Sequence, residues 1–178
     1  MSGMKKAGPL PSNSPTTQAL EPRINQESTK YMKKIAVGLI LGLLAFQAGA
    51  ENLKWLTDLP TAQAQAKKEK KMVFVDFTGS DWCGWCIKLN KEVFTTSEFA
   101  EYAKKNLVLV ELDFPRSKPQ SDALKKANAE LQQKHGASGF PTLLVLNGDG
   151  KELWKQVGYM AGGPKAWIAK LDEAKKKS

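Results

Sequence analysis

The sequence has few of the side chains from which metal sites and acid–base catalysts are built. Its 178 residues include one histidine, His135, and only two cysteines, Cys83 and Cys86. Two thiols cannot make a four-ligand structural zinc site, and the histidine lies far from them in the sequence. We therefore expect no metal ion. We interpret His135, which precedes Gly136, as a solvated helix end rather than a catalyst.

A pattern typical of nucleic-acid binding is also lacking. The chain has 27 Lys and Arg against 18 Asp and Glu, a net charge of +9, but its basic and aromatic residues do not alternate. We therefore expect no nucleic-acid partner. The excess of lysine is typical of solvated helix faces, and an acidic partner or a membrane surface is the weaker interpretation.

No apolar run reaches the roughly 20 residues that span a bilayer comfortably. The candidate run, 35–46, follows two lysines and precedes a small-residue Ala-Gly-Ala sequence at 48–50. A positive segment, a short apolar segment and such a cleavage site form a secretory signal peptide. The sequence therefore predicts a signal peptide over residues 32–50 and a periplasmic or secreted protein, with an uncleaved membrane anchor as the alternative.

The segment before this signal is rich in Pro, Ser, Thr and Asn and has no apolar periodicity, which is typical of disorder. Because a signal peptide normally begins at the N-terminus, we favour Met32 as the true start and interpret residues 1–31 as an over-extension. A genuine polar extension is the alternative. The folded domain is then expected over residues 51–178.

Within that domain, helical and strand-like segments alternate. Continuous apolar runs predict buried strands at 72–77, 107–112 and 142–146, and the turn sequence at 147–150 predicts a hairpin that returns through Val157. Helices are expected over 53–70, after the cysteines, from a Thr95–Glu98 capping box, from Pro119 to near Gly136, and from Gly163-Pro164. Strands joined by helices form parallel crossovers, and the hairpin adds antiparallel strands. The sequence therefore predicts an α/β fold with a mixed central sheet flanked by helices on both faces.

The two cysteines lie where a strand gives way to a helix, in the sequence Trp82-Cys83-Gly84-Trp85-Cys86. The N–H groups and dipole of a helix N-terminus stabilise a thiolate. We therefore expect Cys83 to be an exposed nucleophile and Cys86, about one turn later, to be the buried resolving thiol. Gly84 permits a tight turn, and Trp85 sets packing and access. A static disulfide, or half of a metal site shared between subunits, are the alternatives.

A proline stands directly before the third strand, in Phe140-Pro141-Thr142. Proline lacks an N–H group and is tolerated at the first residue of a strand. The bond before it can be cis, which would expose the preceding carbonyl and N–H groups to an extended peptide. A plain proline at the start of a strand is the alternative.

These motifs, with Val75-Asp76-Phe77 and Lys88, resemble those of the thioredoxin superfamily, especially its secreted members related to the Dsb-type disulfide-interchange proteins and protein disulfide isomerases. The match covers nearly all of residues 53–178. The resemblance implies a thioredoxin fold in which a cis Pro141 packs beside the disulfide and forms a substrate groove with Phe140 and Trp82. It also implies that Asp76 is the family's buried aspartate, which assists proton transfer at the resolving cysteine.

Two features depart from the family pattern. The residues between the cysteines are Gly-Trp instead of Gly-Pro, which leaves the direction of electron flow open. The loop from Phe77 to Trp82 is one residue longer than in thioredoxin, and such a shift can turn a strand side chain to the other face. Asp81 is therefore a competing acid, or a cap of the helix. Glu111 is a second candidate proton shuttle, although a salt bridge is the favoured interpretation.

The resulting hypothesis is an exported thiol–disulfide oxidoreductase that acts on protein disulfides or dithiols, with reductase or interchange activity favoured over oxidase activity. We expect a monomer that needs no organic cofactor and is recycled by a redox partner, for which a membrane-bound protein is a natural candidate. The alternative is a binding or chaperone module with a static disulfide. A thiol sensor of oxidative stress is a weaker alternative.

Overall fold

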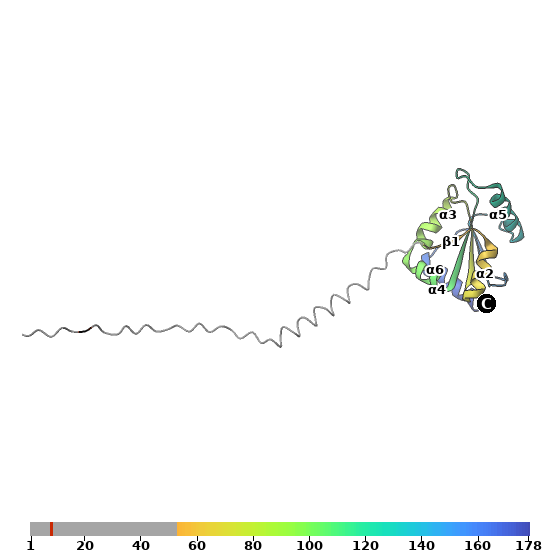
Figure 1. The fold of residues 1–178 in the computed structure, drawn as a ribbon. Coiled ribbons are helices and arrows are strands. Elements are labelled where there is room, and N and C mark those ends of the chain that lie inside the picture. Colours follow the sequence, from red (N-terminus) through yellow and green to blue (C-terminus); the bar gives the residue numbers. More distant parts are fainter. Residues whose placement is uncertain (1–7, 9–52) are drawn as a thin grey trace, which may run out of the picture. The chain divides into compact units, whose positions relative to one another are not determined.

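The computed structural model describes Gly8 and residues 53–178 of the chain (Figure 1). The predicted signal peptide lies outside the described residues, as does the predicted extension apart from Gly8. No helix in the described part is both long enough and apolar enough to cross a membrane. The elements, in chain order, are β1 (Trp55–Leu56), α2 (Leu59–Glu69), β2 (Met72–Thr78), α3 (Gly84–Leu89), the π-helical turn η1 (Asn90–Phe94), α4 (Ser97–Asn106), β3 (Leu107–Asp113), α5 (Asp122–Lys134), β4 (Thr142–Leu146), β5 (Glu152–Val157) and α6 (Gly163–Lys175).

The five strands form one mixed sheet in the order β1-β3-β2-β4-β5. β3 pairs in parallel with both β1 and β2, whereas β4 pairs antiparallel with β2 and β5. Helices α2 and α5 lie on one side of the sheet, and α3, α4 and α6 lie on the other (Figure 1). The predicted mixed sheet with helices on both faces is therefore confirmed.

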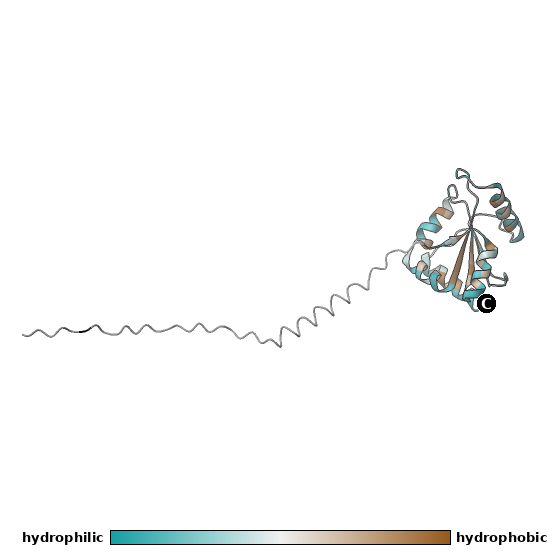
Figure 2. Ribbon diagram, viewed as in Figure 1, coloured by the Kyte–Doolittle hydropathy of each residue, from teal (hydrophilic) through white to brown (hydrophobic). Residues whose placement is uncertain are grey.

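The core has two parts, one on each face of the sheet. Alternate residues of β2 face opposite sides because side chains alternate along a strand, so Phe74 packs with α4 and α6 while Val75 packs with α2. All seven residues of β2 are buried. Figure 2 shows the central strands as the most hydrophobic ribbons, with helices that carry polar residues on their outer sides. A continuous apolar run was therefore a correct sign of a strand covered on both faces.

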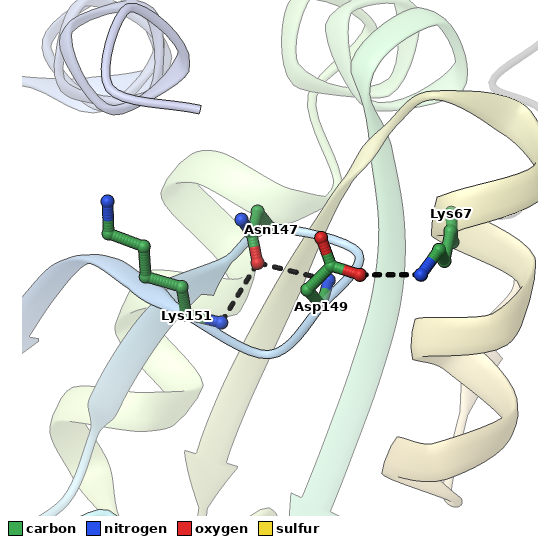
Figure 3. Close-up of polar contacts among 4 residues, drawn as sticks. All are labelled: Lys67, Asn147, Asp149 and Lys151. Carbon is green, nitrogen blue, oxygen red and sulfur yellow. Dashed lines mark hydrogen bonds and ion pairs between the residues drawn. The ribbon is translucent and has the colours of Figure 1, made fainter.

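The hairpin between β4 and β5 forms as predicted, and its turn is fixed to α2 (Figure 3). The Asn147 side-chain oxygen accepts hydrogen bonds from the backbone N–H groups of Asp149, at 3.0 Å, and Lys151, at 2.9 Å. The Asp149 carboxylate pairs with the Lys67 ammonium of α2 at 2.7 Å. A Cβ atom at Gly148 would lie 2.8 Å from the Lys67 Cα atom, so the close approach requires glycine there.

Two of the predicted helices begin later than expected. The helix predicted over 53–70 starts at Leu59, because the Asp58 side chain caps it by accepting a hydrogen bond from the Thr61 N–H group at 2.8 Å. The residues before that cap instead form β1. Likewise, α5 starts at Asp122 rather than at Pro119, because Ser121 is its N-cap.

The predicted capping box of α4 was also displaced by one residue. The N-cap is Thr96, whose hydroxyl accepts a hydrogen bond from the Phe99 N–H group at 3.3 Å. Thr95 instead ends the π-helical turn η1, and its hydroxyl donates to the Lys91 carbonyl. The wider turn adds a residue to the segment before α4, which local spacing does not reveal.

Replacing Thr96 with alanine should lower the free energy of unfolding by about 1 kcal/mol, because the variant loses the side-chain cap of α4. Thr95→Ala is the matched control, since it removes the same hydroxyl from the neighbouring position, and it should cost clearly less. Urea unfolding of both variants measures the difference. A Thr95→Ala protein that loses as much stability as Thr96→Ala would contradict the assignment of the cap.

Candidate active site

The site begins where β2 ends and the chain turns into α3. Cys83 is the N-cap of α3, and its backbone N–H group donates to the Gly79 carbonyl at 2.8 Å. Cys83 and Cys86 form a disulfide, with their Cα atoms 5.2 Å apart. The Cys86 N–H group donates to the Cys83 Sγ atom at 3.2 Å. An N–H group of the first helical turn therefore points at the sulfur that is expected to react.

The expected difference in exposure between the two cysteines is absent from this oxidised structure. Cys83 is 6% exposed and Cys86 is 4% exposed, so the prediction of an exposed Cys83 was wrong. The disulfide holds the Cys83 sulfur against the first turn of α3, where it accepts the Cys86 N–H bond. The surface at this point is formed instead by Gly84 and Trp85, both of which are exposed.

The Phe140–Pro141 peptide bond is cis, as the resemblance implied. Pro141 is buried directly before β4, and its carbonyl accepts a hydrogen bond from the Gly158 N–H group at 2.8 Å. The Phe140 ring contacts the Trp82 ring, with centroids 5.6 Å apart. The structure thus brings the residue before the proline together with the residue before the first cysteine.

A loop that the sequence analysis missed completes this side of the site. It covers residues 114–118, between β3 and α5. The Phe114 carbonyl accepts a hydrogen bond from the Trp82 ring nitrogen at 2.7 Å, and the Phe114 ring contacts the Phe140 ring with centroids 5.1 Å apart. The Arg116 guanidinium lies 3.9 Å from the centroid of the Trp82 ring. Trp82 is therefore held on three sides, by Phe140, Phe114 and Arg116.

Asp81 fixes this loop, so it is not the cap of α3. Its carboxylate accepts hydrogen bonds from the backbone N–H groups of Arg116, Ser117 and Lys118, at 2.6 to 3.2 Å. The bonds from Arg116 and Ser117 are the largest of the effects that lower the pKa of Asp81. A carboxylate engaged in this way is a structural anchor, not the competing acid that the sequence suggested.

Asp76 lies on the face of β2 that α3 covers, so the longer loop has not turned it away from the redox pair. It is 5% exposed, and its Oδ1 atom has no hydrogen-bond partner. Burial raises the pKa of Asp76 well above its usual range, and the negative charges of Glu111 and Asp113 raise it further. Glu111 makes no salt bridge with any residue of the described region, so the favoured interpretation of that residue was wrong.

Trp85 is the most exposed large apolar side chain of the described region, at 57%. Its ring stacks on Tyr159 with centroids 5.3 Å apart, and the Lys88 ammonium lies 5.4 Å and 5.0 Å from the two ring centroids. Tyr159 in turn hydrogen-bonds to Glu92. The ring of Trp85 is therefore covered on one face by Tyr159, while more than half of the side chain is exposed to solvent.

His135 ends α5, as expected, but it is half-buried rather than solvated. Its Nε2 atom is buried without a hydrogen-bond partner, and burial lowers the pKa of the imidazole. Its ring lies 6.5 Å from that of Phe77. In residues 53–178, no group of three or more histidine, cysteine or acidic side chains is arranged to hold a metal ion.

Comparison with known proteins identifies what this arrangement is similar to. Residues 59–175 match the model of the thioredoxin-like domain family. Disulfide bond reductase DsbH of Chlamydia pneumoniae is 36% identical over 127 residues, which are 71% of this chain and 75% of that protein. Thioredoxin-related protein DsbJ of the same organism is 28% identical over 137 residues, but this chain spans only 39% of its length. The solved structure of a DsbH oxidoreductase superposes with a TM-score of 0.67 at 34% identity, over 74% of this chain and 90% of that one. The predicted thioredoxin fold is thereby confirmed.

The buried carboxyl group should make stability depend on pH. A group with a raised pKa binds its proton more tightly in the folded state, so the free energy of unfolding falls as the pH rises from the unfolded value of about 3.9 towards the raised pKa. Asp76→Asn removes this fall, so the stability of the variant relative to the wild type should rise by up to about 1.4 kcal/mol for each pH unit between these two values.

Urea unfolding of the oxidised protein between about pH 4 and about pH 8 measures this effect. Asp122→Asn, which removes an exposed carboxylate at the start of α5, is the matched control and should keep the wild-type slope. An Asp76→Asn protein with an unchanged slope would show that Asp76 is ionised in the folded state.

Proposed function

The chain belongs to the thioredoxin-like family, and from this premise we propose that it is an exported thiol–disulfide oxidoreductase that reduces or exchanges disulfides in proteins. The observation that carries the proposal is the Cys83–Cys86 disulfide at the N-terminus of α3, where the Cys86 N–H group points at the Cys83 sulfur. A hydrogen bond of this kind favours the thiolate over the thiol, so it makes Cys83 the better nucleophile and leaving group of the pair.

In the reducing direction, the Cys83 thiolate attacks one sulfur of a substrate disulfide. A bond forms between Cys83 and that sulfur, the substrate disulfide breaks, and the other substrate sulfur leaves with the electron pair. Cys86 then loses its proton and attacks the Cys83 sulfur. The Cys83–Cys86 disulfide forms, and the substrate is released as a dithiol. Asp76 is the proposed acceptor of the Cys86 proton, because it is a buried carboxyl group that lines the same cavity as Cys86.

The proposed substrate surface lies around the buried Cys83–Cys86 pair. We assign to it Trp82 and Phe140, whose rings contact each other, the exposed Gly84 and Trp85, and the cis Pro141. The exposed large apolar side chains of the described region are Trp85, Ile87 and Val157. Two of these lie on α3, and Val157 pairs with Thr142, next to Pro141. An exposed apolar surface at the redox pair suits contact with an unfolded or flexible protein segment.

The reductase direction is favoured by the name of the similar Chlamydia protein, a disulfide bond reductase. Export is supported by the signal peptide predicted over residues 32–50. A reductase in an oxidising compartment is itself oxidised in each cycle, so a redox partner must return electrons to Cys83–Cys86, and a membrane-bound partner fits that location. We propose that the protein acts as a monomer.

Cys86→Ala should trap substrates, because Cys83 can still attack a protein disulfide but nothing releases the product. Mixed disulfides should accumulate and should disappear when dithiothreitol is added, which a non-reducing gel detects. Cys83→Ser is the matched control, and it should form no mixed disulfide and show only the uncatalysed rate of exchange. Full activity in Cys83→Ser would rule out this mechanism. An absence of trapping in Cys86→Ala would instead favour a binding or chaperone module with a static disulfide.

The reduction potential of Cys83–Cys86 tests the direction. We expect a value nearer to about −270 mV, typical of thioredoxin, than to the about −120 mV of a strongly oxidising enzyme. Equilibration of the full chain in glutathione buffers measures it, and a shift of 30 mV corresponds to about 1.4 kcal/mol. A potential between about −120 and about −180 mV would point to an oxidase or isomerase, and one well below about −300 mV to a structural disulfide.

A further inference from the structure

A cavity of about 130 Å³ lies between the sheet and the start of α3. Its lining includes Cys86 and Asp76, which are buried, and Glu111, which is half-buried. The exposed side chains of Ile87 and Asn90 line it as well. The cavity therefore joins the inner side of the redox pair to the surface of the protein at Ile87 and Asn90.

Asp76 and Glu111 are neighbours in this cavity because of the register of the sheet. They are directly paired across the parallel strands β2 and β3, so their side chains project from the same face. The preceding pair on that face, Phe74 and Leu109, belongs to the apolar core. The two carboxyl groups are thus the first polar side chains that each strand presents on the face covered by α3.

The Asp76 carboxyl group is poorly satisfied by the protein. Its Oδ1 atom is buried and has no hydrogen-bond partner, and nearly all buried polar atoms in proteins have one. Glu111 has no cationic side chain in a salt bridge with it in the described region. The cavity is large and polar enough for water to bridge the two groups.

Among residues 53–178, the other charged groups that act on the pair are Asp113 and Lys118. Asp113 raises the pKa values of both Asp76 and Glu111, although its own carboxylate is engaged by the N–H and hydroxyl groups of Ser80 at 2.9 and 2.6 Å. Lys118, which donates to the Ser80 hydroxyl, lowers the pKa of Glu111. Burial is the main cause that raises the pKa values of both groups, and it is stronger at Asp76. The two groups therefore titrate as a pair, and Glu111, which is half-buried, is the member nearer to solvent.

We propose that Glu111 is the outer member of a carboxyl pair with Asp76, and that the pair carries the Cys86 proton through this cavity to solvent when the mixed disulfide is resolved. The inference rests on the proposed function and adds a positioning residue to it. Asp76 passes its proton to the Glu111 carboxylate and takes the proton of the Cys86 thiol. The Cys86 thiolate attacks the Cys83 sulfur, the bond between Cys83 and the substrate breaks, and the substrate sulfur leaves with the electron pair. Glu111 then releases its proton to water.

The resolving step can be observed by itself with the aryl disulfide DTNB. Attack by Cys83 of the reduced full chain releases one coloured thiolate, and attack by Cys86 on the mixed disulfide releases the second. The second phase is intramolecular, so its rate does not depend on the DTNB concentration. Glu111→Gln should slow that phase about tenfold, a part of what acid–base catalysis usually contributes, and should leave the first phase unchanged.

The variant should also shift the pH profile of the second phase. Removal of the Glu111 charge takes away a like charge that raises the pKa of Asp76, so the profile should move to lower pH. Glu111→Asp, which keeps the charge, should restore most of the rate. Glu101→Gln removes an exposed carboxylate from α4 and is the matched control for the change in net charge.

Each outcome decides between the two proposals. A Glu111→Gln protein with the wild-type rate and pH profile would overturn the carboxyl pair alone, as would equal losses in Glu111→Gln and Glu111→Asp. A wild-type protein that releases no second thiolate would overturn the proposed function, and the pair with it.

An NMR titration of the Asp76 carboxyl carbon in the oxidised protein is independent of activity. Its pKa should fall in Glu111→Gln and not in Glu101→Gln, and an unchanged value would contradict the pair.

Discussion

The burial of β2 on both faces is the constraint on which the rest of the structure depends. A strand with every side chain buried must have a helical layer on each side, and it must pair with strands along both edges. These requirements place β3 and β4 beside it. The redox pair stands at the carboxyl end of β2, directly after the loop that leaves the strand. The cysteine pair therefore lies where it does because it follows a strand that is buried on both faces and paired along both edges.

Much of this arrangement follows from short-range patterns. The apolar runs predict β2, β3 and β4, and the Asn-Gly-Asp-Gly turn predicts the hairpin, because a buried strand and a tight turn each have a local sequence requirement. The cysteine pair and the cis proline are recognised because they form contiguous motifs. What these motifs cannot give is the exposure of Cys83, since the disulfide itself determines where its sulfur lies.

The errors of prediction concern contacts between residues distant in sequence, or choices between adjacent residues. Asp81 was considered as an acid and as a helix cap, but its partners lie 35 to 37 residues further along the chain, where no local spacing indicates them. Thr95 and Thr96 are equally good caps by composition, and the π-helical turn before them decides in favour of the second. A salt bridge was the favoured interpretation of Glu111, with a proton shuttle as the other candidate role. The sheet register instead places it beside another acid.

Asp81 holds loop 114–118 by bonds to its main chain, so the position of the loop beside Trp82 does not depend on the side chains that the loop carries. The carboxylate bonds to the main chain of Arg116, Ser117 and Lys118, and main-chain N–H groups are the same for every residue except proline. Exchange of these three side chains thus leaves the anchor in place while changing the charge and size of what stands beside Trp82. The position of the loop and the chemistry of the surface beside Trp82 are therefore set by different parts of the same three residues, the first by their main chain and the second by their side chains.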